Sequence, residues 1–226
     1  MKRPIVILCA VIVAIAFSFV FYMVHSKNTG MPPISSVASS TPVDLSGQAI
    51  FTDGEHGFSI VYPEKYQTDP TFATSYHLPA TWRVNALPNA TGTPIFTIIS
   101  YRIKNDSSYP RYFDAEVRIG ASSDPKELAR CEKPATDQNE QALPDVTLGT
   151  TKFKVFSFGD AAMMQYEKGI SYRVVHDSTC IAIEQLQTGS SYRDDPATSK
   201  DVSDADLQKY YADLDTVVKS FSFSRP

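Results

Sequence analysis

The fold of this chain is decided by two neighbouring apolar segments, Ile170-Ser-Tyr-Arg-Val-Val-His176 and Cys180-Ile-Ala-Ile-Glu-Gln-Leu186. Both are rich in the β-branched and aromatic residues that are frequent in strands. The short polar turn Asp177-Ser-Thr179 separates them, which predicts an antiparallel hairpin. Both segments also have apolar residues on either face at their centres, a pattern typical of strands covered on both sides. We therefore expect this hairpin near the middle of a sheet.

Further strand patterns lie on both sides of the hairpin. Alternating apolar and polar residues predict strands over 49–52, 58–62, 95–104, 115–119, 146–148 and 152–158, with shorter candidates at 81–84 and 163–167. Glycine-containing turns after residues 52 and 148 join two further hairpins. Within 95–104, the alternation places Ile99, Tyr101 and Ile103 on one face.

Two helices are expected among these strands. Asp124-Pro125 suits the start of a short helix that ends near Cys131, because Asp caps a helix and Pro fits its first turn. Ser203 is the N-cap of a longer helix with one apolar stripe, which consists of Leu207, Tyr210, Tyr211, Leu214 and Val217. A last strand is predicted over 218–223. The fold class is therefore α+β, an antiparallel sheet with helices packed on its faces.

One strand motif resembles a known family. The segment Gly57-Phe-Ser-Ile-Val-Tyr-Pro63 is similar to the strand that opens many PsbP/Mog1-like domains, and the final helix with Leu214-Asp-Thr-Val-Val-Lys-Ser-Phe-Ser-Phe223 is similar to the way they close. The resemblance spans about residues 48–226 and implies an antiparallel sheet with helices on its faces. The family includes a photosystem II subunit, a nuclear-transport factor and many membrane-anchored bacterial proteins, and the last group matches this layout best. No binding residue of the first two maps onto this chain.

The N-terminal segment from Pro4 to Val24 contains no charged residue. As a helix it is long enough to cross a bilayer core of ~30 Å, which takes about 20 residues. We interpret residues 1–24 as an uncleaved signal anchor in the lipid bilayer; a cleaved signal peptide is the alternative. Lys2 and Arg3 then place the N-terminus in the cytoplasm. Residues 25–47, rich in Ser, Thr and Pro, are expected to be a flexible linker, and residues 48–226 an extracytoplasmic domain.

The three cysteines fit this topology. Cys131 and Cys180 are a natural disulfide pair in an oxidising compartment, whereas two separately buried thiols are the alternative. Cys9 lies within the predicted anchor. A catalytic thiol or a zinc site is less favoured, because the chain has no Cys-x-x-Cys motif and no paired Cys and His spacing.

Four places were weighed as reactive or metal sites. His56 could join a metal site with the acids of its turn, and His77 has no partner visible in the sequence. His176-Asp177-Ser178 has the residue types of a hydrolase triad, but neighbours in a tight turn cannot face one another in relay. The acidic run from Asp194 to Asp206 lacks the spacing of a calcium loop. We therefore expect no catalytic, cofactor-binding or metal-binding residue.

Composition narrows the function without fixing it. The formal net charge of −4 gives no basic surface of the kind that nucleic acid needs. We expect a non-enzymatic domain that binds a protein or a component of the cell envelope. Two alternatives stay open: an envelope hydrolase whose residues meet only in the fold, and a domain that holds a small ligand among its Tyr and Phe side chains.

Overall fold

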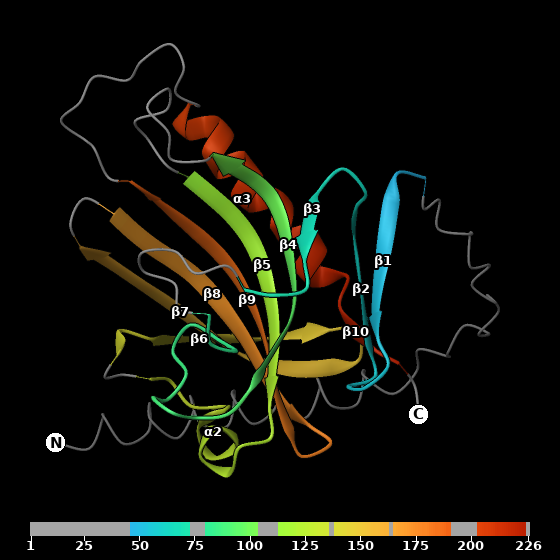
Figure 1. The fold of residues 1–226 in the computed structure, drawn as a ribbon, viewed down its shortest axis with the longest axis vertical. Helices are drawn as coiled ribbons and strands as arrows, with labels where there is room; N and C mark the ends of the chain where they lie inside the picture. The colour runs from blue at the N-terminus through green and yellow to red at the C-terminus, as the bar shows by residue number, and fades with distance from the viewer. Residues whose placement is uncertain are drawn as a thin grey trace, which may run out of the picture. The chain divides into compact units, whose positions relative to one another are not determined.

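A seven-stranded antiparallel sheet forms the centre of the computed structural model (Figure 1). Its strand order is β3-β4-β5-β9-β8-β7-β6. The strands are β3 Gln67–Asp69, β4 Thr93–Ile103, β5 Phe113–Ser122, β6 Gln141–Leu148, β7 Thr151–Ala162, β8 Gln165–His176 and β9 Thr179–Ser190. The order is mostly that of a meander, with β9 inserted beside β5. The predicted antiparallel α+β class is thus found in the described residues.

The structure describes residues 46–72, 80–103, 113–135, 138–162, 165–190 and 203–224. The predicted membrane anchor of residues 4–24 lies outside these ranges, as does almost all of the predicted linker. Within them, the helices are too short or too polar to cross a membrane. Leu45–Pro226 forms one unit by its internal contacts, and the description below concerns that unit.

The central hairpin is confirmed as β8 and β9, which pair from Gln165↔Ser190 to His176↔Thr179. Asp177 and Ser178 form its two-residue turn, with φ values of 45° and 60°. Positive φ at both central positions is the geometry whose twist matches that of the flanking strands. Strand β9 is the fourth of the seven strands, and its residues 180–189 are all buried, so it is covered on both faces as the apolar pattern predicted.

A smaller sheet of three strands completes the β structure. Strands β1 (Gln48–Asp53) and β2 (Phe58–Pro63) form the predicted hairpin, and β10 (Ser222–Phe223) pairs with β2. The prediction of a strand over 218–223 was wrong in its extent. Helix α3 (Asp204–Lys219) extends into the first two residues of that segment, because Val217 and Val218 continue its buried stripe.

Helix α3 and the small sheet cover one face of the large sheet. In Figure 1 the helix runs along the long strands, and it contacts β4, β5 and β9. Ser203 caps it, with its Oγ accepting the N–H of Asp206 at 3.2 Å. The apolar core lies between these layers and includes Phe58, Ile60, Ile98, Val117, Ile119, Ile181, Ile183, Leu214, Val217 and Phe221. Aromatic pairs such as Phe51 on Phe96, at 3.9 Å between ring centroids, pack within it.

Two further strand predictions need correction. A bulge between Ile99 and Tyr101 places these two residues on opposite faces of β4, since Ile99 pairs with Glu116 and Tyr101 with Ala115. Residues 81–84 form bends and a turn instead of a strand. The strand predicted over 163–167 is found at Gln165, Tyr166 and Glu167, where β8 begins, and residues 163–164 lie outside the described ranges. Strand β3 was not predicted, because its three residues are too few to show a pattern.

Candidate functional site

The second face of the large sheet is unusual because its buried positions are largely polar. Register partners share a face, and the pairs Arg118↔Glu184, Ser171↔Glu184 and Glu167↔Thr188 place polar side chains in neighbouring strands. These side chains are at most 8 % exposed, and the set includes Asp114, Glu116, Arg118, Glu167, Ser171, Arg173, Glu184 and Thr188. Buried charge requires partners, so this face is where we looked for a functional site.

The loop of residues 80–92 lies directly on this face. Gly120 of β5 makes this possible: a Cβ there would stand 1.9 Å from the carbonyl oxygen of Trp82. Gly92 has the same role within the loop, since its Cβ would stand 2.3 Å from the Trp82 indole. Trp82 is 2 % exposed. The two glycines therefore bring the backbone of Arg83 and Val84 against the charged sheet.

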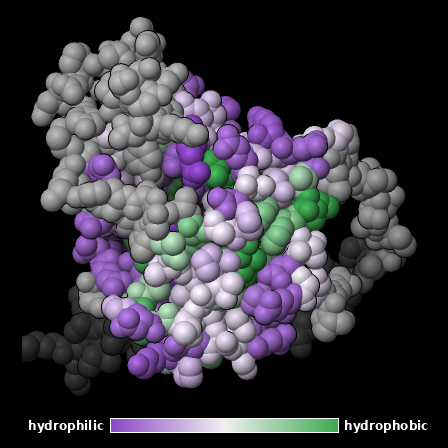
Figure 2. All heavy atoms as spheres, in the orientation of Figure 1, coloured by the Kyte–Doolittle hydropathy of each residue, from purple (hydrophilic) through white to green (hydrophobic). Residues whose placement is uncertain are grey.

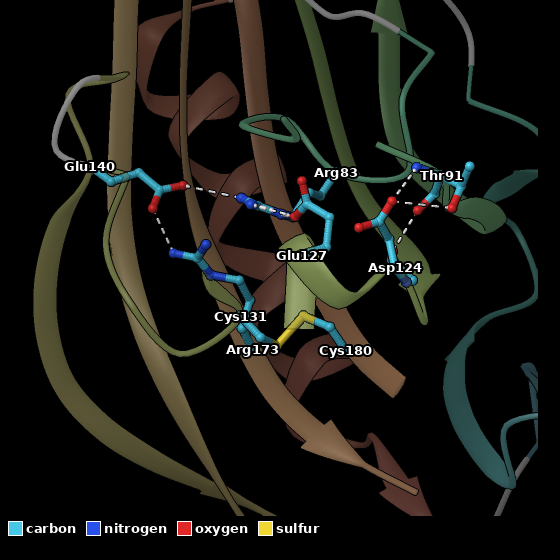
Figure 3. The surroundings of a disulfide bond; sticks show 9 residues. Arg83, Thr91, Asp124, Glu127, Cys131, Glu140, Arg173 and Cys180 are labelled. Carbon is cyan, nitrogen blue, oxygen red and sulfur yellow. Dashed lines mark hydrogen bonds and ion pairs between the residues drawn. A yellow bond between two sulfur atoms is a disulfide. The ribbon is translucent and has the colours of Figure 1, made fainter. Parts of the chain in front are cut away.

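A buried ion network holds this loop in place (Figure 3). The guanidinium of Arg173, on β8, donates to Glu140 at 2.6 Å. That of Arg83 donates to Glu127 at 2.8 Å and lies 3.8 Å from Glu140. Glu127 belongs to α2 (Pro125–Arg130), which begins at the Asp124 cap as predicted. All four charged side chains are almost completely buried, so each depends on its partners.

Backbone donors complete the network. Glu127 accepts the N–H of Leu87 at 2.6 Å, and Glu140 accepts that of Ala135 at 2.7 Å. Glu184 of β9 accepts the N–H of Val84 at 2.8 Å. Burial raises the pKa of Glu184, and the Val84 N–H and the two guanidinium groups offset only part of this.

A disulfide joins Cys131 to Cys180 beside this network, with 5.7 Å between their Cα atoms (Figure 3). The predicted pair is thus bonded in the structure. Both cysteines are completely buried, and Trp82 and Ala182 pack against them. The bond ties the end of α2 to β9 and thereby fixes the elements that carry Glu127 and Glu140.

A pocket of about 300 Å³ opens beside the network. Asp160 and Glu167 line it from β7 and β8, where they are register partners on the same face of the sheet. Asn85 and Gln138 line it from the two loops that cover this face. Asn85 donates to Glu140 at 2.9 Å, so the ion network also positions one wall of the pocket. We take this pocket as the candidate functional site.

The electrostatics of the pocket centre on Glu167. Burial, together with the nearby carboxyl groups of Asp160 and Glu184, raises the pKa of Glu167 to about 7, and Arg118 partly opposes this rise. Glu167 is 8 % exposed, and its Oε2 atom has no hydrogen-bond partner among the described residues. The Oε1 atom of Gln138 also has no hydrogen-bond partner among the described residues. The pocket is thus lined by two residues that have acceptor atoms without a described partner.

Replacing Glu167 by glutamine should make the protein more stable at pH 8. The pKa of Glu167 is about 7 in the folded state and near 4.5 in the unfolded state. The free energy of unfolding therefore increases as the pH falls from 7 to 4.5 and the folded state takes up the proton, and it decreases as the pH rises again. We expect Glu167→Gln to gain about 1–2 kcal/mol at pH 8, since water in the pocket screens part of the repulsion, and nothing at pH 4.5. Urea unfolding at both pH values measures this.

The matched control is Glu132→Gln, which removes the same charge from an exposed position. It should leave the pH dependence of the unfolding free energy unchanged. Equal gains from both variants would show that only the net charge of the chain matters. A loss of stability in Glu167→Gln at pH 8 would contradict the assignment of Glu167 as a repelled, buried carboxylate.

A second charged cluster lies further along β4 and β5. Arg102 donates to Asp114 and to Glu116, both at 2.9 Å, and Arg118 donates to Glu116 at 2.6 Å. Burial raises the pKa of Asp114 to about 6, and Arg102 opposes the rise. These groups form a chain of ion pairs, although Asp114 Oδ1 has no hydrogen-bond partner among the described residues.

The histidines weighed in the sequence take structural positions. His56 Nδ1 lies 2.9 Å from Asp53 Oδ2 within its own turn. The ring of His176 stacks on Phe223 at 3.8 Å, and its Nε2 lies 3.5 Å from Asp177 Oδ2. No group of three or more His, Cys, Asp or Glu suited to a metal ion occurs in the described ranges. His77 and residues 194–202 of the acidic run lie outside those ranges, and Asp206 belongs to the first turn of α3.

The pocket residues were not predicted from the sequence. A signal for them exists in β8, where Ser171 and Arg173 occupy alternate positions of the segment 170–176, which was expected to be buried on both faces, and Glu167 continues the same alternation. Polar residues at such positions indicate a buried polar layer. The loop residues Asn85 and Gln138 carry no comparable signal, because polar residues are ordinary in loops.

Comparison with known proteins gave structural matches alone. No protein-family model matches the chain, and no curated protein does either. PsbP (CyanoP) of Synechocystis sp. PCC 6803 is 10 % identical, with 83 % of this chain and 98 % of that chain covered and a TM-score of 0.38. LpqN of Mycobacterium tuberculosis, described as involved in cell envelope biogenesis, is 9 % identical, with 79 % and 91 % covered and a TM-score of 0.35. The likeness to PsbP predicted from residues 57–63 is thus present among the structural matches.

Proposed function

We propose that this chain is a non-enzymatic binding domain that works outside the cytoplasm and is held at a membrane by residues 4–24. The observation that carries the location is the buried Cys131–Cys180 disulfide, because such bonds persist in oxidising compartments and are rare in the cytosol. The uncharged N-terminal segment supports the same topology. The partner is a protein or another component of the cell envelope.

The candidate pocket supports a binding role. It is held by a rigid sheet on one side and by loops fixed through an ion network and a disulfide on the other. A preformed cavity of this kind is typical of a ligand site. In the part of the chain that the structure describes, the ring of His176 stacks on Phe223, and its Nε2 lies 3.5 Å from Asp177 Oδ2.

Surface labelling of intact cells tests the location. We expect a Glu132→Cys variant, made in a Cys9→Ala background, to react with a membrane-impermeant maleimide before lysis, because Glu132 is exposed and next to the disulfide. Labelling that requires lysis would place the domain in the cytoplasm and overturn the proposal.

Crosslinking at the pocket tests the binding role. A photoreactive maleimide at Asn139→Cys, an exposed residue that lines the pocket, should capture a defined envelope component. The same reagent at Glu55→Cys, in the β1–β2 turn, serves as the control for position. Equal capture from both positions, or none from Asn139→Cys, would contradict binding at the pocket.

A further inference from the structure

The pocket is suited to one class of ligand because of what lines it. The lining residues within the described ranges include two carboxyl groups and three side-chain amides, and none of them is basic. Asn85 uses an amide hydrogen on Glu140, which leaves its carbonyl oxygen as an acceptor. Glu167 Oε2 and Gln138 Oε1 are two more acceptors, and neither has a partner in the described part of the chain. The lining of the site is therefore suited to a positively charged hydrogen-bond donor.

The burial of Glu167 distinguishes this pocket from an acidic patch on the surface. Its side chain is nine-tenths buried, it lines the pocket, and one of its oxygens has no described partner. Asp160 stands directly opposite it across the β7–β8 ladder, and directly opposed like charges are destabilising. A cation between the two carboxyl groups would remove that repulsion and satisfy the buried oxygen.

Size and lining favour an organic cation over a metal ion. The volume of about 300 Å³ corresponds to roughly ten water molecules at ~30 Å³ each, which is more than a single ion occupies. Phe158 lines the same pocket, and an aromatic ring is a favourable neighbour for an ammonium or guanidinium group. The ring has room there because β8 carries Gly169, whose Cβ would stand 2.7 Å from the Phe158 Cζ atom.

We propose that this pocket binds an organic cation, an ammonium or guanidinium group, between Asp160 and Glu167, with the amides of Asn85 and Gln138 accepting its remaining hydrogens and Phe158 beside it. The inference rests on the proposed binding function and names the chemistry of its ligand. The group belongs either to a free amine or to a Lys or Arg side chain of a partner, and both present the same donors.

Calorimetric titration of the full chain in detergent at pH 8 tests the proposal, with agmatine as the probe because it carries both cationic groups. We expect a Kd on the order of 0.1–1 mM, as for other very small ligands. Glu167→Gln and, independently, Asp160→Asn should each weaken binding at least tenfold. Glu132→Gln should leave it unchanged, and 1,4-butanediol, which has the same chain length and no charge, should not bind.

The outcomes separate cleanly. Absence of agmatine binding to the folded chain, or equal binding by Glu167→Gln and the wild-type chain, overturns the proposal. Calcium chloride that displaces agmatine and binds more tightly also overturns it, because the pocket would then be a metal site. The capped tripeptide Gly-Arg-Gly distinguishes the sources: tighter binding than agmatine indicates a protein side chain, and weaker binding indicates a free amine.

Failure here is distinct from failure of the proposed function. If agmatine does not bind while the Asn139→Cys crosslink still captures one envelope component, the domain binds through other chemistry. If capture fails as well, the binding role itself is wrong.

Discussion

Replacing Arg173 by methionine is expected to lower the free energy of unfolding by about 3–5 kcal/mol. Arg173 is completely buried, and its guanidinium lies 2.6 Å from Glu140 and 3.8 Å above the ring of Phe156. Methionine fills much of the space and removes the charge, so Glu140 is left buried with Arg83 as its nearest cation, at 3.8 Å. Urea unfolding at pH 7, followed by circular dichroism, measures the loss.

Two controls show whether the loss comes from unpaired charge. Lys154→Ala breaks an exposed ion pair with Asp145, whose N–O distance is 3.0 Å, and should change stability by less than about 1 kcal/mol. Adding Glu140→Gln to Arg173→Met should recover part of the loss, because the orphaned charge is gone. Purely additive losses in the double variant would mean that the two residues are not coupled.

Removing the disulfide is expected to have an effect of similar size. The bond closes a sequence separation of 49 residues, and on the chain-entropy account its loss lowers the free energy of unfolding by about 4 kcal/mol. Cys131→Ala with Cys180→Ala is the suitable variant, because both sites are fully buried and alanine adds no unpaired polar group. Guanidinium unfolding of this variant, compared with the wild-type chain, measures the loss.

Local exchange then shows where the loosening occurs. Amide hydrogen exchange should accelerate in α2 and the loop up to Glu140, which the bond ties to β9, more than in the β1–β2 hairpin. Cys9→Ala is the matched control, since it removes the third cysteine and should leave stability unchanged. A loss below about 1 kcal/mol in the double variant would show that packing around Trp82 holds α2 without the bond.

Sequence reasoning was most successful where the residues that determine an element are close together in the chain. The β8–β9 hairpin was predicted because its apolar residues and short turn are continuous in the chain. The Asp124 and Ser203 caps were predicted because capping depends on a few neighbouring residues. Errors arose at the β4 bulge and at residues 81–84, where tertiary contacts decide the local geometry.

The candidate site could not be predicted from the sequence, for a related reason. Asn85, Gln138, Asp160 and Glu167 come from four separate segments, and nothing in their spacing indicates that they meet. The β7–β8 register brings Asp160 beside Glu167, and Gly120 lets Trp82, in the loop that carries Asn85, lie on the sheet. A glycine within a predicted strand can indicate such a close approach, but it does not say which segment arrives.

In Figure 2, the described residues form a largely hydrophilic surface with small hydrophobic areas. Larger apolar surface would be exposed before the fold is complete. Strand β2 pairs with β10, so Ser59 can meet its partner Ser222 only after 163 more residues have been made. Phe58 likewise packs on Phe221, at 5.0 Å between ring centroids, only when the end of the chain is present. At ribosomal speeds of about 5–20 residues per second, that interval is roughly 8–33 s. The early hairpin therefore needs protection from aggregation while the rest of the chain is made.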